Sequence, residues 1–257
     1  MQLPPATAVS PPQPANALLQ TLSLAGERGD RRLFEGLNLS LVPGSITWLR
    51  GRNGRGKTTL LRLLAGLSSP ADGNLLIQGQ SLRELGAEGR RLWVYVGHQN
   101  ALKDDLTVTE SLRFLARLHG LPHDAPALKT ALQRLGIAQR QHAAVRTLSQ
   151  GQRRRVALAR LALSSAAPLW LLDEPFDALD ADGIQALNAV LQQHAEQGGA
   201  VLLTSHQALT LTQPQPQVLD LEPFAPPAAS KARGQAQIHA PAPAQAQAQD
   251  DRHAATR

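Results

Sequence analysis

The stretch from Gly51 to Thr59 limits what this 257-residue chain can fold into more than any other part of its sequence. It fits the pattern of a glycine, four further residues, and Gly-Lys-Ser/Thr. An apolar segment at 46–49 precedes it and a leucine-rich segment at 60–65 follows it, which predicts a buried strand, a glycine-rich loop and a helix. Such a loop can direct several backbone N–H groups at one phosphate, beside the positive end of the helix. The stretch therefore predicts nucleotide binding; the alternative is a glycine-rich turn without a ligand.

Each part of this loop has a predicted task. The glycines allow the tight turn, Lys57 can reach the outer phosphates, and the Thr58 hydroxyl can ligate Mg²⁺. The predicted phosphate-binding residues are Gly51, Arg52, Asn53, Gly54, Arg55, Gly56, Lys57, Thr58 and Thr59.

Two carboxylates follow a continuous apolar run at 169–172, which is typical of a buried parallel strand. At the carboxyl edge of a parallel sheet, Asp173 and Glu174 would face the ligand crevice. Asp173 is then expected to hold Mg²⁺, directly or through water, and Glu174 to orient or deprotonate the attacking water. The alternative is an acid pair that caps the next helix.

Composition excludes several classes of protein. Hydrophobic residues make up 42% of the chain, enough for a core, and the absence of cysteine excludes disulfides and thiolate metal sites. The net charge of +6 can indicate nucleic acid or an anionic membrane, but the arginines are scattered and aromatic residues are only 3%. Solvated arginines are the favoured interpretation, and no nucleic-acid partner is predicted. No apolar run approaches the roughly 20 residues of a membrane span, and residues 1–16 lack the features of a signal peptide.

The chain divides by composition into three parts. Residues 1–16 are rich in Pro and Ala, and residues 223–257 form an Ala/Gln/Pro tail, so both are predicted to be disordered. The folded domain is placed at 17–222. Within it we expect strands at 37–42, 46–49, 75–77, 92–96, 169–172 and 200–204, and helices beginning after Thr107, at 125–135 and at about 152–163. The helical part at about 100–165 is expected to be an insertion into the α/β domain.

Four further segments complete a recognisable pattern. Residues 148–152, Leu-Ser-Gln-Gly-Gln, resemble the signature of the ATP-binding-cassette (ABC) ATPases, usually Leu-Ser-Gly-Gly-Gln. Residues 178–180 are similar to the D-loop of that family, His206 in Thr-Ser-His to its switch histidine, and Gln99 to its Q-loop glutamine. Taken alone, His206 is a surface histidine after a strand. The resemblance covers about 17–222 and implies an α/β fold: a P-loop ABC-ATPase domain with a helical subdomain and a small N-terminal antiparallel β part.

The same resemblance implies how ATP and Mg²⁺ are bound. Two copies would form a head-to-tail dimer, with ATP between the phosphate loop of one copy and the signature of the other. Ser149 and Gly151 would contact the γ-phosphate across the dimer, and Asp180 belongs to the D-loop. Glu174, His206 and Gln99 would be catalytic, while Thr58, Gln99 and Asp173 would surround Mg²⁺. Gln99 would also couple to an integral membrane subunit.

One branch of the family is the most similar, the ATP-binding subunit of the cytochrome c maturation transporter, often called a haem exporter. The segments that carry this likeness are 96–107, 152–161 and 167–170, together with the short end after His206. One departure is the lack of an aromatic residue near Arg31 and Arg32, where many family members stack adenine.

Several functions remain open at this point. The first is an ATPase that powers a membrane complex for c-type cytochrome biogenesis, bound through its partners to the cytoplasmic face of the bacterial inner membrane. The second is the ATPase of another small-substrate ABC transporter. A soluble ABC protein acting on DNA or ribosomes usually carries two cassettes or coiled-coil insertions, and this chain has neither. A non-catalytic scaffold would not need intact Lys57, Asp173, Glu174 and His206.

Overall fold

The computed structural model describes residues 16–227 except Ala87, Ser165 and Thr212. The disorder expected at 1–16 and 223–257 therefore falls almost entirely outside the described residues. The described residues up to Pro226 form one compact unit, which carries the fold described below.

An antiparallel sheet is built mainly from the N-terminal part of the chain, with the strand order β2-β1-β4-β5. Its strands are β1 (Leu19–Arg28), β2 (Arg31–Leu41), β4 (Asp72–Ile77) and β5 (Gln80–Ser81). In β2, the alternation of Leu37, Leu39 and Leu41 with exposed or half-buried residues places the leucines on the buried face. Strand β1 pairs with β2 through several register shifts, so its own pattern is irregular.

A parallel sheet forms the centre of the domain, in the order β6-β7-β8-β3-β9. Its strands are β3 (Ile46–Arg50), β6 (Trp93–Val96), β7 (Leu169–Leu172), β8 (Ala200–Thr204) and β9 (Gln217–Asp220). Every residue of β7 and β8 is buried, as expected for inner strands with both faces covered. Their parallel direction brings the ends of β3, β7 and β8 to one edge of the sheet.

Most of the α-helices begin where the sequence supplies an N-terminal cap. The helices are α1 (Lys57–Leu64), α2 (Leu82–Leu85), α3 (Val108–Leu118), α4 (Ala125–Arg134), α5 (Gln150–Leu163) and α6 (Ala181–Glu196). Thr107 and Ser149 form capping boxes with Glu110 and Gln152, and Asp124 and Asp180 cap α4 and α6. Short 3₁₀ turns lie at Glu88–Arg91, Ala138–Arg140, Val145–Thr147 and Glu222–Phe224. Among the described residues, no helix is long and apolar enough to cross a membrane.

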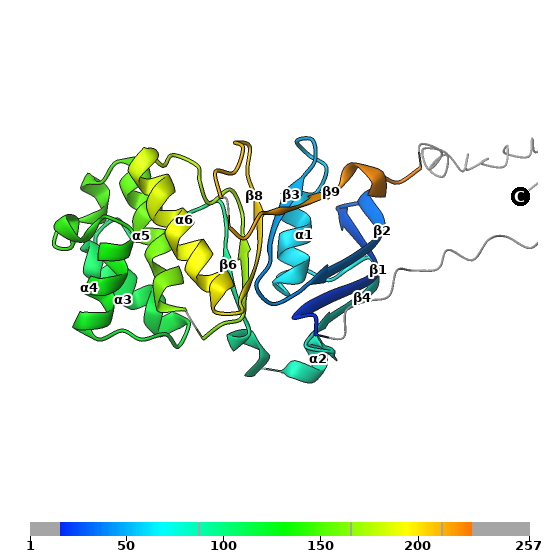
Figure 1. Cartoon of the computed structure of the whole chain (residues 1–257), viewed down its shortest axis with the longest axis horizontal. Coiled ribbons are helices and arrows are strands. Elements are labelled where there is room, and N and C mark those ends of the chain that lie inside the picture. Colours follow the sequence, from blue (N-terminus) through cyan, green and yellow to red (C-terminus); the bar gives the residue numbers. More distant parts are fainter. Residues whose placement is uncertain (1–15, 87, 165, 212, 228–257) are drawn as a thin grey trace, which may run out of the picture. The chain divides into compact units, whose positions relative to one another are not determined.

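Two apolar clusters lie on opposite faces of the parallel sheet. One contains Trp170 and Leu172 of β7 with leucines of α3, α4, α5 and α6; the other contains Leu169 and Leu171 with α1 and the antiparallel sheet. Figure 1 shows the same layers, with α1 between the two sheets and the helices α3 to α6 beyond the parallel sheet. Because successive side chains of β7 point to opposite faces of the sheet, this one strand contributes to both clusters.

The predicted fold class is confirmed, with an antiparallel N-terminal sheet, a parallel sheet behind the phosphate loop, and helices. One helix boundary differs from the prediction. Helix α5 begins at Gln150 rather than about residue 152, because Ser149 is its cap. Phe224, in the turn after β9, packs against the second apolar cluster.

Candidate functional site

The phosphate loop connects β3 to α1 and has the backbone that its glycines allow. Gly51, Gly54 and Gly56 have φ values of 143°, 76° and 109°, in the region that favours glycine. A Cβ on Gly56 would lie 3.0 Å from the Cβ of Leu33 in the neighbouring sheet. Within the described part of the chain no side chain caps α1, so the N–H groups of its first turn remain available for an anion.

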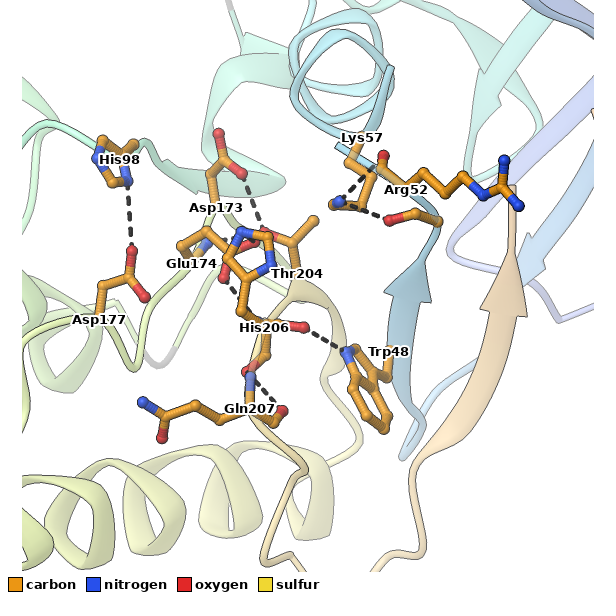
Figure 2. A network of polar contacts seen from close by, with 12 residues as sticks. Trp48, Arg52, Lys57, His98, Asp173, Glu174, Asp177, Thr204, His206 and Gln207 are labelled. Atoms are coloured by element: carbon orange, nitrogen blue, oxygen red, sulfur yellow. Dashed lines mark hydrogen bonds and ion pairs between the residues drawn. The ribbon is translucent and has the colours of Figure 1, made fainter. Parts of the chain in front are cut away.

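Lys57 lies at the first position of α1. Its Nζ donates to the carbonyl oxygen of Gly51 at 2.7 Å, so the ammonium group is folded back over the loop (Figure 2). A phosphate seated on the start of α1 would therefore find this positive charge within the loop that surrounds it.

A hollow of about 470 Å³ opens beside the loop. Three cationic side chains, the loop and the acidic strand end all line it, which gives an anion and a cation separate places to bind. Its lining residues are Arg28, Arg31, Leu33, Asn53, Gly54, Gly56, Lys57, Thr58, Thr59, His98, Asp173, Glu174, Asp177 and His206.

The oxygen atoms in this hollow suit Mg²⁺. Thr58 and Asp173 both line it, and hydroxyl and carboxylate oxygens are the donors that Mg²⁺ prefers. The described part of the chain has no group of three or more His, Cys, Asp or Glu side chains that could hold a metal alone. That donor set fits an ion that keeps several waters and shares substrate phosphates, as Mg²⁺ usually does.

The acidic strand end is fixed by hydrogen bonds from β8. Thr204 Oγ1 donates to Asp173 Oδ1 at 3.0 Å and accepts from the N–H of Glu174 at 2.8 Å. Asp173 and Glu174 are only 3% and 8% exposed. Burial raises the pKa of the Glu174 carboxyl, although nearby His206 opposes part of this rise. A carboxylate with a raised pKa is the stronger base toward a water molecule.

His206 faces Glu174 from the loop after β8. Its N–H donates to Glu174 Oε2 at 3.1 Å, and its Nε2 lies 3.5 Å from Glu174 Oε1. Trp48 of β3 holds this loop through a hydrogen bond from its Nε1 to the carbonyl oxygen of Ser205, 3.2 Å long (Figure 2). The histidine and the acid therefore meet although they follow different strands.

The remaining predicted residues lie outside the lining of this hollow. Ser149 is the exposed cap of α5, and Gln99 is exposed in the segment after β6. Gly151 packs so closely on the next loop that a Cβ would lie 2.4 Å from the carbonyl oxygen of Ala178. Asp180 caps α6 through the N–H of Gly183, which lowers the pKa of the Asp180 carboxyl.

Arg52 and Arg55 do not line the hollow but bind Glu222, in the segment after β9. The N–H of Arg52 donates to Glu222 Oε1 at 2.8 Å, and Arg55 Nη2 donates to Glu222 Oε2 at 2.6 Å. The hydrogen bond from Arg55 is the main cause that lowers the pKa of Glu222 to about 2. Glu222 therefore anchors the phosphate loop to the segment after β9, and no local pattern in the sequence pointed to it.

Five residues of the hollow were not predicted from the sequence: Arg28, Arg31, Leu33, His98 and Asp177. The first three come from the hairpin of β1 and β2, far from the loop in sequence. His98 and Asp177 are neighbours of predicted motifs, and that adjacency is the only signal that could have found them.

Comparison with known proteins agrees with this geometry. The family model described as ABC transporter matches residues 34–177. The chain is 46% identical over 194 residues to the cytochrome c biogenesis ATP-binding export protein CcmA of Pseudomonas aeruginosa, covering 76% of this chain and 95% of that protein. It is also 46% identical to CcmA 1 of Cupriavidus metallidurans, covering 76% of this chain and 93% of the relative.

A solved structure supports the fold. An ABC transporter ATP-binding protein from Pyrococcus furiosus superposes with a TM-score of 0.69 at 22% identity, over 81% of this chain and 99% of the other. The chain therefore belongs to the ABC transporter family, as one of its ATP-hydrolysing subunits, and the CcmA proteins are its relatives there.

Proposed function

We propose that this chain hydrolyses ATP to drive a membrane complex needed for c-type cytochrome biogenesis, as the names of its relatives suggest. The observation that supports hydrolysis best is the position of Glu174, a buried carboxylate that shares one hollow with Lys57 and contacts His206. Through membrane subunits the chain would lie on the cytoplasmic face of the inner membrane.

The triphosphate would sit on the start of α1. Lys57 then neutralises the outer phosphates, and the backbone N–H groups of the loop bind their oxygens. Bound Mg²⁺, held by Thr58 and Asp173 with Gln99 nearby, would supply positive charge for the developing transition state. Glu174 orients the attacking water and accepts its proton, and His206 donates to the γ-phosphate oxygens.

A second copy of the chain would complete the site. Ser149 and Gly151 lie together at the start of α5, outside the hollow of their own copy. A helix start with an exposed serine suits an anion presented from outside. In a head-to-tail dimer this start would contact the γ-phosphate bound by the other copy, so ATP binding closes the dimer and hydrolysis opens it.

Gln99 would pass this motion to the membrane subunit. It is exposed in a segment whose neighbour His98 lines the hollow, so it is near both the nucleotide and the surface. The haem-related role of the complex, either haem transfer or release of a haem chaperone, belongs to this proposal.

The role is tested by deleting the protein from its bacterium. Gels stained for covalently bound haem should lose the c-type cytochromes, while b-type cytochromes remain in absorption spectra. Wild-type protein should restore c-type staining, and a Glu174→Gln variant should not. Normal c-type staining in the deletion strain would instead indicate an ABC transporter for another small substrate.

A further inference from the structure

Arg154 is a buried cation that the roles described so far do not use. It lies in the second turn of α5 and is 3% exposed. Its three nitrogens donate to five carbonyl oxygens and one amide oxygen, and none of these acceptors is a carboxylate. Every N–H group of the guanidinium is therefore directed at neutral groups.

These acceptors belong to two segments that end at the nucleotide hollow. Arg154 Nη2 donates to the carbonyl oxygens of Asp173 at 2.9 Å and Glu174 at 2.7 Å. Nη1 donates to the carbonyl oxygens of Gly97 at 3.0 Å and His98 at 3.3 Å, on the segment after β6.

The contact with the second segment extends past Gln99. Nη1 also donates to the side-chain oxygen of Asn100 at 3.2 Å, so Arg154 binds the residues immediately before and after Gln99. Nε donates to the carbonyl oxygen of Pro175 at 3.4 Å, which adds a third contact to the segment that follows β7. The Arg154 side chain thus binds both the segment after β6 and the segment after β7.

The backbone that Arg154 holds at Glu174 is in an uncommon conformation. Glu174 has a φ of 48°, in the left-handed region, which is unfavourable for a residue with a side chain. Its N–H is held by Thr204 at 2.8 Å and its carbonyl oxygen by Arg154 at 2.7 Å. This conformation sets where the Glu174 carboxylate points, because it fixes the direction of the Cα–Cβ bond.

We propose that Arg154 is a positioning residue for ATP hydrolysis. It holds the backbone just before Gln99, the Asn100 side chain just after Gln99, and the backbone at Glu174, and it ties all three to the helix that begins at Ser149. The inference rests on the roles proposed above for Glu174 and Gln99. When the start of α5 moves on contact with a second copy, the Arg154 guanidinium would then shift the backbone of Glu174 and so the position of its carboxylate.

Burial makes Arg154 an unfavourable choice for packing alone. Removal from water lowers the pKa of its guanidinium, which reflects the cost of burying the cation. Only a planar fork with five donors can bind carbonyl groups of two separate segments at once. The ammonium of a lysine is a single point and could satisfy one segment but not both.

Arg160, six residues later in α5, provides a matched control. It is also buried, at 9% exposed, and burial lowers its pKa to about 10. Its guanidinium donates to the carbonyl oxygen of Tyr95 at 2.5 Å and lies beside the His119 ring, away from Glu174. Substitution of Arg160 therefore removes an equivalent buried arginine without releasing either catalytic segment.

The test compares Arg154→Lys, Arg154→Gln and Arg160→Lys in the full-length chain. Turnover is measured against ATP concentration, binding with a fluorescent ATP analogue, and folding by thermal melts. We expect kcat to fall about 10- to 100-fold in both Arg154 variants, with nucleotide affinity changed less than about threefold. Arg160→Lys should lower the melting temperature but leave kcat within about threefold of wild type.

A second comparison separates positioning from general damage. If Arg154 acts through Glu174, adding Arg154→Lys to a Glu174→Gln background should reduce the residual rate less than about twofold. Folded Arg154 variants with wild-type kcat, or equal kcat losses in the Arg154 and Arg160 variants, would overturn the inference. Normal hydrolysis by Glu174→Gln alone would instead refute the proposed role of Glu174.

Discussion

His194 should make the stability of this protein fall on mild acidification. The imidazole lies in the last turn of α6, is 3% exposed, and stacks on Trp170 with ring centroids 3.7 Å apart. Burial is the main cause that lowers the pKa of His194 to about 4, from an ordinary 6.5. The folded chain therefore keeps this ring neutral at a pH where the unfolded chain protonates it.

The direction of the effect follows from proton binding. Between pH 6.5 and 4 the unfolded state binds more protons at this site, so the free energy of unfolding rises with pH and is lost as pH falls. The full difference of pKa corresponds to about 3 kcal/mol, and about 2 kcal/mol of this is lost between pH 7.5 and pH 5. Below pH 4 the site should contribute no further loss.

Urea unfolding followed by tryptophan fluorescence, at pH 7.5 and pH 5, measures this loss. His194→Gln removes the titrating ring, so its stability should fall about 2 kcal/mol less than that of wild type over the same interval. His123→Gln, at an exposed position, should fall as much as wild type. Equal losses in wild type and His194→Gln would refute the argument that burial keeps His194 neutral.

Three further outcomes are expected. Lys57→Ala should lower ATP turnover by about 100-fold or more without changing the melting temperature, measured in purified protein. Gly151→Ala should still give a folded monomer but should prevent its ATP-induced dimerisation in size-exclusion chromatography. The added Cβ would lie 2.4 Å from the carbonyl oxygen of Ala178 in the same copy, and so displace the α5 start that is proposed to contact the other copy's ATP. A chain ending after residue 226 should melt within a few degrees of wild type, whereas one ending after residue 221 should melt lower, since it loses the carboxylate and the packed 3₁₀ turn that anchor the phosphate loop.

The parts of the fold that could be predicted are those with strong local signals. The inner strands β7 and β8 are uninterrupted apolar runs, and α3 carries its own capping box. Strand β1 was not located because its register shifts break the alternation of apolar residues. Strand β9 was missed because it is mostly exposed and follows a segment rich in proline and glutamine, so only its pairing with β3 makes it a strand.

The residues of the candidate site also fall into those that a local sequence motif indicates and those that it does not. Lys57, Glu174 and His206 could be proposed from sequence because they lie in short motifs whose residue types suit the chemistry proposed for them. The residues that position them are different in kind. Glu222 contacts the phosphate loop from 170 positions away along the chain, through the backbone N–H of Arg52.

Arg154 shows most clearly why such positioning residues escape sequence reasoning. Within the run of three arginines at 153–155, only the structure distinguishes the buried one from its neighbours, which pair with Asp104 and Asp180. Its acceptors are mostly backbone carbonyls, a group that every residue type provides. The residue types at the acceptor positions therefore give no sign in the sequence that Arg154 binds them. A motif can identify the groups that act on a substrate, whereas the groups that hold them in place become visible only when the backbone is folded.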